Sequence, residues 1–281
     1  MIRTVRHADF PLAELLAAKR RSVTVVLPAR ECAETVGAVV ERIASLEGLV
    51  DQILVVDAAS EDGTANAAAE AGAEVVQQDA LMAGHGPTLG KGDALWRALT
   101  ACRGDVVAFV DADTRDFSGG FVNGLVGPLL TDPTVGFVKG TYQRPFMAGG
   151  QELPGGGGRV SQLTARPLLA AFYPDLEPLI QPLAGEVAAP RELLERIPFA
   201  TGYAVEMAML LEVREQLGAE AIVQCDLGER RNHHQPLGAL RPMAEVVLAT
   251  VSRRLAAEGR LAAQPPGPEI VERPPLTTVA V

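Results

Sequence analysis

DVVAFVDAD, residues 105–113, is the stretch that decides the fold. Its apolar, β-branched run predicts a buried strand over Asp105–Val110, followed at once by Asp111-Ala112-Asp113. Two carboxylates two residues apart at a strand end can lie at the same edge of the sheet. Together they can bind one hard cation that bridges the two phosphates of a diphosphate. Two solvated turn aspartates are the alternative, and the motif alone leaves both interpretations open.

Similar apolar runs precede this strand, and helical patterns separate them. Further strands are predicted over Ser22–Leu27 (SVTVVL), Gln52–Asp57 (QILVVD) and Ala73–Gln77 (AEVVQ). Helices are predicted over Glu34–Leu46, over the Ala-rich run between SEDG and Gly72, and over Lys91–Arg103, the last as an amphipathic helix. This alternation predicts an α/β fold with a mainly parallel sheet.

Ligands of such sheets lie at the carboxyl ends of the strands. Pro28, Asp57 and Asp111 all fall at predicted strand ends, so we expect them to meet in one crevice. Lys91, in a glycine-flanked turn that opens a helix, is placed to face the same crevice. A helix dipole disfavours a cation at the helix start, so a lysine there indicates that an anion binds nearby. The alternative is an exposed lysine in the first turn that binds nothing.

After Asp116 the alternation of strand-like and helical patterns becomes less regular. Helices are predicted over Gly119–Leu130, Leu163–Phe172, Ala204–Leu217 and Leu240–Glu258, and strands over Val135–Tyr142 and Ala221–Leu227. We therefore divide the chain into an N-terminal extension (1–21), an α/β half (22–116), a second half of the same domain (117–260) and a Pro-rich tail (261–281). The composition of the tail is typical of disorder.

The bulk composition excludes several classes of protein. The 281 residues carry a net charge of −10, and no basic run offers the footprint that nucleic acids require. The three scattered cysteines predict a reduced, cytoplasmic protein without a disulfide framework. Because no apolar run approaches the roughly 18 residues of a membrane span, we expect a soluble protein that does not bind membranes.

The blocks around these strand ends resemble the nucleotide-diphospho-sugar transferases of the GT-A fold, whose metal signature is D-x-D. VVLPAR (25–30), VVDAASEDGT (55–64) and FVDAD (109–113) match in order and spacing. Five further blocks resemble the glucosyl-3-phosphoglycerate synthase family, which includes mannosyl-3-phosphoglycerate-forming relatives. They are GKGDALWRAL (90–99), DADTRDF (111–117), GGGRVSQLTARPL (156–168), QPLAGE (181–186) and FATGYAVE (199–206). The resemblance covers roughly residues 20–255.

The resemblance implies a GT-A fold, with a mainly parallel sheet flanked by helices and a C-terminal, helical acceptor-binding part. It further implies that the half 22–116 binds the nucleotide sugar and that the half 117–260 binds the acceptor. It implies a divalent cation, Mg²⁺ or Mn²⁺, held by Asp113 and by a histidine of the late segment. We choose His234 as that ligand, with His233 as the alternate; an ungapped match to some relatives would instead place Asn232 there. The donor-binding residues that it implies are Pro28, Ala29, Arg30, Asp57, Ala58, Lys91, Asp111 and Ala112.

On the acceptor side, the glycine run 155–158 allows backbone N–H groups to turn inward as an anion nest, and Arg159 adds a bidentate fork. A merely flexible loop is the alternative. Together with the resemblance, the implied acceptor-binding residues are Gly158, Arg159, Val160, Ser161, Tyr203 and Arg230. Trp96 is expected to pack within its helix.

The implied reaction is the metal-dependent transfer of glucose, with retention, from an NDP-glucose such as UDP-glucose to the 2-hydroxyl of D-3-phosphoglycerate. Lys91, and Asp113 through the bound cation, are expected to stabilise the leaving diphosphate. Glu206 is the one candidate for a carboxylate nucleophile. GDP-mannose, or both donors, remains open, as does a non-catalytic sugar-nucleotide binder. A nucleotidyltransferase would carry a Gly-rich, basic phosphate loop in place of PAREC (28–32), and the lack of membrane spans disfavours a processive synthase. Members are typically homodimers.

Overall fold

The computed structural model describes residues 2–148, 151–153, 157–230, 236–263 and 267–279. Its strands are β1 (Arg3–Arg6), β2 (Val23–Ala29), β3 (Gln52–Asp57), β4 (Glu74–Gln77), β5 (Val106–Phe109), β6 (Phe137–Gln143), β7 (Phe146–Ala148), β8 (Gln151–Leu153), β9 (Val187–Pro190), β10 (Phe199–Ala200), β11 (Ile222–Glu229) and β12 (Glu272–Arg273). Its α-helices are α1 (Leu12–Ala18), α2 (Ala33–Ala44), α3 (Thr64–Glu70), α4 (Lys91–Ala98), α5 (Gly119–Thr131), α6 (Arg166–Phe172), α7 (Arg191–Arg196), α8 (Val205–Leu217) and α9 (Leu237–Ala257).

One eight-stranded sheet organises the molecule, in the order β1-β11-β6-β9-β5-β2-β3-β4. Every pairing is parallel except those of β9, which lies antiparallel between β5 and β6. The α/β architecture with a mainly parallel sheet is therefore confirmed. β9 was not predicted from the sequence, because Val187–Pro190 is short and Ala-rich, and alanine has a low strand propensity.

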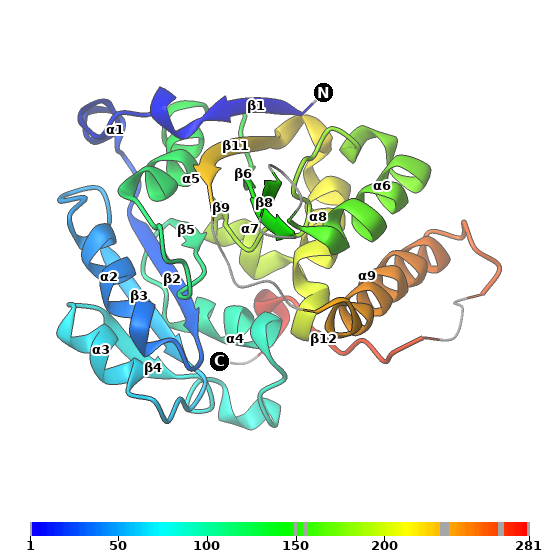
Figure 1. The fold of residues 1–281 in the computed structure, drawn as a ribbon, viewed down its shortest axis with the longest axis horizontal. Coiled ribbons are helices and arrows are strands. Elements are labelled where there is room, and N and C mark those ends of the chain that lie inside the picture. The colour runs from blue at the N-terminus through cyan, green and yellow to red at the C-terminus, as the bar shows by residue number, and fades with distance from the viewer. Residues whose placement is uncertain (1, 149–150, 154–156, 231–235, 264–266, 280–281) are drawn as a thin grey trace.

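Helices cover both faces of the sheet (Figure 1). Alternate residues of β2, such as Val25 and Leu27, pack with α1, α2 and α5 on one face. Val26 points to the other face, which packs with α4, α6, α8 and α9. This alternation follows from the period of two residues in a strand, and it explains why the strands read as continuous apolar runs.

The two ends of the chain belong to the same body. β1, in the N-terminal extension, pairs in parallel with β11 at the edge of the sheet. The tail was expected to be disordered, and this expectation is wrong for its described part, because β12 pairs antiparallel with β10. The tail has partners elsewhere in the folded chain, which its composition alone does not reveal. One of them is Trp96, whose Nε1 donates to the Pro274 carbonyl at 2.8 Å.

Helix α4 also differs from its prediction. Its polar and apolar residues are segregated as predicted, but no side of it faces solvent, because Gly92–Ala98 are all buried, including the charged Asp93 and Arg97. These two side chains form an ion pair with each other at 3.1 Å, which allows charged positions to face the interior. Within the described ranges, no helix combines the length and apolarity that crossing a bilayer requires.

Candidate active site

The carboxyl ends of β2, β3 and β5 lie side by side, as predicted. Asp57, the last residue of β3, is buried, and its Oδ2 accepts hydrogen bonds from Gln77 Nε2 at 2.9 Å and from the Ser60 N–H at 3.1 Å. Its Oδ1 is buried without a partner among the described residues. A buried carboxylate oxygen without a donor is costly, so it is suited to receive an N–H of a ligand such as a nucleobase.

Lys91 and Asp111 meet at the centre of the site. Lys91 Nζ lies 2.6 Å from Asp111 Oδ1 and 3.0 Å from Glu206 Oε1, at the start of α8. Burial by itself lowers the pKa of Lys91, but the two carboxylates outweigh it and raise this pKa above its usual range. Burial alone would raise the pKa of Asp111, yet Lys91 and Arg230 hold it well below the ordinary value. Both groups are therefore charged at neutral pH.

A glycine makes this close approach possible. A Cβ built on Gly185 would lie 2.5 Å from Lys91 Nζ and 2.6 Å from Asp111 Oδ1, closer than real Cβ contacts. Gly185 precedes β9, the antiparallel strand that passes beneath the pair. The backbone at Gly185 therefore lies so close to the Lys91–Asp111 pair that it has no room for a side chain.

Arg230, directly after β11, joins both aspartates of the D-x-D motif. Its Nη1 lies 2.9 Å from Asp111 Oδ2 and also contacts Glu186, while Nη2 lies 3.1 Å from Asp113 Oδ1. Tyr142 completes the cluster, because its hydroxyl donates to Glu186 Oε2 at 2.9 Å. Burial, and then the neighbouring Glu186, raise the pKa of Tyr142 to about 12, so it stays a phenol. Arg230 thus orients carboxylates, a role that its assignment to the acceptor pocket did not anticipate.

Asp113 is the aspartate that remains available to a cation. Both oxygens of Asp111 are occupied by Lys91 and Arg230, whereas the Asp113 side chain is 66% exposed and gives one oxygen to Arg230. A carboxylate oxygen facing a polar pocket fits the hard-ligand chemistry of Mg²⁺ or Mn²⁺. The described residues contain no group of three or more His, Cys, Asp or Glu that could hold a metal. His233, His234 and Asn232 lie outside the described residues.

A helix begins at the opposite wall of the site. Residues 159–160 are helical, a π-helical turn follows over Ser161–Ala165, and α6 continues it. The first backbone bond of this helix runs from the Gln162 N–H to the Gly158 carbonyl at 3.0 Å. The preceding N–H groups lie in the first turn, where a helix leaves its donors unsatisfied and favours anions. The glycine run and Arg159 were predicted to bind an anion here; residues 154–156 of that segment lie outside the described ranges, and anion binding stays a prediction.

These groups line one pocket of about 890 Å³. The predicted site residues in its wall are Lys91, Asp111, Asp113, Gly158, Arg159, Val160, Ser161, Tyr203, Glu206 and Arg230. The other predicted donor residues are not among the lining residues; they are Pro28, Ala29, Arg30, Asp57, Ala58 and Ala112. They belong to the neighbouring strand ends, where Ala58 N donates to the Ala29 carbonyl at 2.9 Å. The pocket therefore brings Lys91, Asp111 and Asp113 together with the helix start at Gly158–Ser161.

Three buried residues beside the pocket, Glu186, Tyr142 and Lys139, were not assigned from the sequence. Glu186 is a single charge within QPLAGEVAAP, and Tyr142 and Lys139 lie in a segment that was assigned only as a strand. Lys139 Nζ donates to the Ala184 carbonyl at 2.6 Å, directly before Gly185. A charged residue inside a predicted core strand is the signal that could have found Lys139, since buried charges require partners. Glu186 precedes β9, which was not predicted, so the sequence offers no such signal for it.

The fold and the site define a nucleotide-sugar glycosyltransferase of the GT-A type. Residues 24–158 match the family model "Glycosyl transferase family 2". The glucosyl-3-phosphoglycerate synthase of Mycolicibacterium smegmatis is 48% identical over 248 residues, which are 88% of this chain and 82% of the relative. The protein of the same name from Petrotoga mobilis is 39% identical, over 92% of this chain and 82% of the relative. The chain belongs to the glucosyl-3-phosphoglycerate synthase family.

Solved structures agree with this assignment. The mannosyl-3-phosphoglycerate synthase of Rubrobacter xylanophilus superposes with a TM-score of 0.92 at 44% identity, covering 99% of this chain and 97% of that one. The glucosyl-3-phosphoglycerate synthase of Mycobacterium tuberculosis, in complex with Mn²⁺, UDP and glucosyl-3-phosphoglycerate, superposes with a TM-score of 0.86 at 38% identity, covering 99% of each chain. The GT-A fold expected from the sequence is confirmed.

Proposed function

We propose that this chain is a glucosyl-3-phosphoglycerate synthase. It transfers glucose, with retention, from an NDP-glucose, UDP-glucose first among them, to the 2-hydroxyl of D-3-phosphoglycerate. The single observation that carries the proposal is the pocket in which Lys91 and Asp113 face the helix N-terminus at Gly158–Ser161. One wall suits a diphosphate with its cation, and the other suits a small phosphorylated acid.

On the donor side, Asp57 Oδ1 receives an N–H of the base, and the ends of β2 and β3 seat the nucleoside. Lys91 compensates charge on the departing diphosphate, which is the role for which its raised pKa keeps it protonated. Asp113 and His234 would hold Mg²⁺ or Mn²⁺, with His233 as the alternate ligand. That cation supplies Lewis-acid stabilisation of the diphosphate leaving group.

On the acceptor side, the first-turn N–H groups of residues 159–161 and the Arg159 guanidinium bind phosphate or carboxylate. Tyr203, which is 57% exposed in the pocket wall, covers the bound acid. Ser161 provides a hydroxyl donor at the same helix start. Holding the acceptor at two points orients its 2-hydroxyl toward the sugar and converts the reaction into an effectively unimolecular step.

Transfer proceeds by substitution on one face of the sugar. The acceptor oxygen forms a bond to the anomeric carbon as the bond to the diphosphate breaks, and an oxygen of the departing diphosphate takes the hydroxyl proton. Glu206 is the alternative as a covalent nucleophile. Its ion pair with Lys91 at 3.0 Å instead supports a role in holding Lys91 in place.

The test is a mass-spectrometric assay with D-3-phosphoglycerate, Mg²⁺ and either UDP-glucose or GDP-mannose. A hexosyl-phosphoglycerate product supports the reaction, and D-glycerate serves as the matched acceptor that lacks the phosphate. Folded protein that binds nucleotide but forms no product with any donor refutes the acceptor assignment and favours a non-catalytic binder. The structural likeness to the Rubrobacter mannosyl enzyme gives a specific reason to include GDP-mannose.

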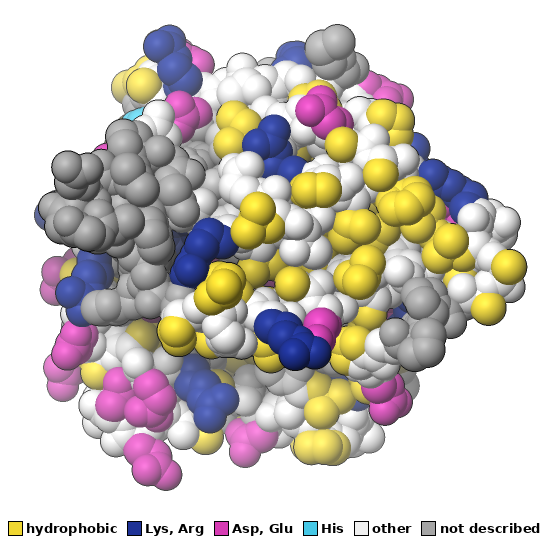
Figure 2. All heavy atoms as spheres, turned by 45° about the vertical axis from the view of Figure 1, so that its right-hand side comes forward, with side chains coloured by type: hydrophobic (Ala, Val, Ile, Leu, Met, Phe, Trp, Pro, Cys, Tyr) yellow, Lys and Arg dark blue, Asp and Glu magenta, His cyan; other side chains and the backbone are white. Residues whose placement is uncertain are grey.

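A homodimer in the cytoplasm completes the proposal. Figure 2 shows hydrophobic side chains gathered over one side of the molecule, and Leu163, Leu237 and Leu248 are 72%, 69% and 49% exposed. Exposed apolar surface of this kind is typical of protein interfaces. The cysteines Cys32, Cys102 and Cys225 are buried and free, which suits a reducing compartment. Light scattering of the purified protein tests the dimer.

A further inference from the structure

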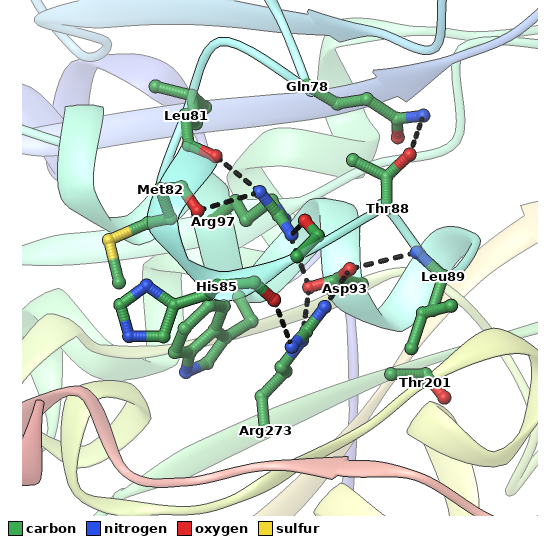
Figure 3. Close-up of polar contacts among 12 residues, drawn as sticks. Gln78, Leu81, Met82, His85, Thr88, Leu89, Asp93, Arg97, Thr201 and Arg273 are labelled. Carbon is green, nitrogen blue, oxygen red and sulfur yellow. Dashed lines mark hydrogen bonds and ion pairs between the residues drawn. The ribbon is translucent and has the colours of Figure 1, made fainter.

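The loop 78–90 joins β4 to α4 and ends immediately before Lys91. Two arginines hold it through its backbone carbonyls (Figure 3). Arg97, on α4, donates to the carbonyls of Leu81 at 2.5 Å, Met82 at 3.1 Å and Gly86 at 2.8 Å. Arg273, on β12 and 180 residues away from Asp93 in sequence, donates to those of His85 at 2.7 Å and Pro87 at 3.0 Å. The shape of the loop is therefore set by side chains outside it.

Asp93 couples the two arginines. Its carboxylate is fully buried, and Oδ1 accepts from Arg97 Nε at 3.1 Å and from Arg273 Nε at 2.8 Å. Its Oδ2 accepts from Arg273 Nη2 at 2.9 Å and from the Leu89 N–H at 2.8 Å. Burial alone raises the pKa of Asp93, but the hydrogen bonds from Arg273 and Arg97 outweigh it and lower this pKa. A buried carboxylate thus anchors the last turn of the loop to α4 and to the tail.

The same tail segment secures the opposite side of the Lys91 backbone. β12 pairs with β10, and the Thr201 N–H donates to the Val271 carbonyl at 2.9 Å. The Gly202 N–H then donates to the Leu89 carbonyl at 3.0 Å, and Gly92 packs against the Ala200 carbonyl so tightly that a Cβ there would overlap it. The first turn of α4 is held between the loop and β10, and both of these are held by the tail.

Contacts with the indole of Trp96 fix the tail in register. Trp96 Nε1 donates to the Pro274 carbonyl at 2.8 Å, and the Arg273 guanidinium lies 5.6 Å from the centre of its ring. His85, in the loop, meets the same ring edge-on at a centroid distance of 5.4 Å. Leu276 is buried beyond it. Loop, helix and tail therefore form one packed unit behind the active site.

We infer that residues 271–276 act as a strap and that Arg273 is a positioning residue for Lys91, with an effect on the donor side of the transfer reaction. The inference rests on the proposed function for its kinetic part only. Within the described part of the chain, the side-chain bonds of Arg273 go to His85, Pro87 and Asp93, which are not lining residues of the pocket. Arg273 acts by immobilising the backbone that delivers Lys91 to the diphosphate, and a displacement of 1 Å at a positioning group can cost about 100-fold in rate. Gly158, Val160 and Ser161, in the proposed acceptor wall, have no hydrogen bond to the strap within the described part of the chain.

The test compares three variants of the full-length chain. Arg273→Ala removes the side-chain bonds of Arg273 to the loop and to Asp93, while those of Arg97 remain. Arg273→Lys keeps the charge but loses the planar fork that reaches the carboxylate and two carbonyls at once. Glu272→Gln is the matched control, because Glu272 is the neighbouring residue on β12 and pairs with Arg253 at 2.6 Å, away from the loop. Each variant is measured by hydrogen exchange with mass spectrometry and by kinetics with each substrate varied in turn.

For Arg273→Ala we expect backbone amides of residues 79–92 to exchange at least about tenfold faster, with peptides of β2 and β5 unchanged. We expect kcat/KM for the sugar nucleotide to fall about tenfold and KM for 3-phosphoglycerate to stay within about twofold. Arg273→Lys should lie between Arg273→Ala and wild type, and Glu272→Gln should match wild type. This pattern supports the strap.

Unchanged exchange in residues 79–92 overturns the inference, as does an equal loss of efficiency toward both substrates. If Arg273→Ala does not fold, the Arg273→Lys variant decides by the same two measurements. If the wild-type chain transfers no sugar, the proposed function fails, while the exchange data still decide whether the strap holds the loop.

Discussion

Replacing Gly185 by alanine should disable transfer while leaving the fold intact. The added Cβ would lie 2.5 Å from Lys91 Nζ and 2.6 and 2.9 Å from the two oxygens of Asp111. Ordinary contacts of a methyl group begin at about 3.5 Å, so the Lys91 ammonium must move by about 1 Å. Because Lys91 bonds both Asp111 and Glu206, this displacement disturbs the whole cluster. We expect kcat to fall about 100-fold, since a shift of this size is typically worth that factor.

The cost to stability should be smaller. Overpacking of this kind costs about 1–3 kcal/mol, and the atoms in conflict are the ends of two flexible side chains rather than backbone. The assay measures UDP release and hexosyl-phosphoglycerate by mass spectrometry, alongside thermal melting. Gly136→Ala is the matched control, because its Cβ would meet a leucine side chain, Leu217, remote from the pocket. A folded Gly185→Ala variant with more than half of the wild-type kcat would refute the reasoning.

Three further predictions concern groups of the same cluster. Asp113→Ala should lower kcat at least about 100-fold, because the carboxylate left open to a cation is lost; near-normal turnover over a Mg²⁺ titration would remove the metal role from Asp113. Glu206→Gln should lower kcat only about tenfold, since Glu206 positions Lys91, whereas a loss of more than about 10⁴-fold in a folded variant would indicate the nucleophile. Burial, offset in part by Glu206, lowers the pKa of Lys139 from 10.5 to about 8. Between these values the unfolded chain binds the extra proton, so stability rises with pH; from pH 8 to pH 10 wild type should gain about 2 kcal/mol over Lys139→Met in urea unfolding, and parallel curves would contradict this.

The parallel half of the fold was predictable because its signals are local. Each run such as Val23–Ala29 or Gln52–Asp57 is buried on both faces, and an apolar run interrupted by helical periodicity has few other solutions. The D-x-D motif and Lys91 were found because strand ends of a parallel sheet meet at one edge. Family blocks predicted Gly158–Ser161 as acceptor-binding residues, and these residues line the same pocket as Lys91 and Asp113.

What escaped prediction depends on partners far apart in sequence. In the sequence Glu186 is a single charge, and its structural role becomes clear only from its ion pair with Arg230, 44 residues later. Arg230 was assigned to the acceptor, but its guanidinium is taken by carboxylates whose positions only the folded sheet defines. The tail was expected to be disordered because composition records what a segment could bury by itself, and Arg273 is ordered by a carboxylate on α4.

The sequence by itself determined the strands β2 to β6 and β11, and the charged residues at the ends of β3 and β5. Only the tertiary structure decided how those charges are shared: Asp111 is saturated by Lys91 and Arg230, Asp113 stays open, and β12 supports the helix that bears Lys91. The physical reason is range. Propensity and periodicity act over a few residues, whereas a buried charge is specified by whichever oppositely charged group the fold brings within about 3 Å of it.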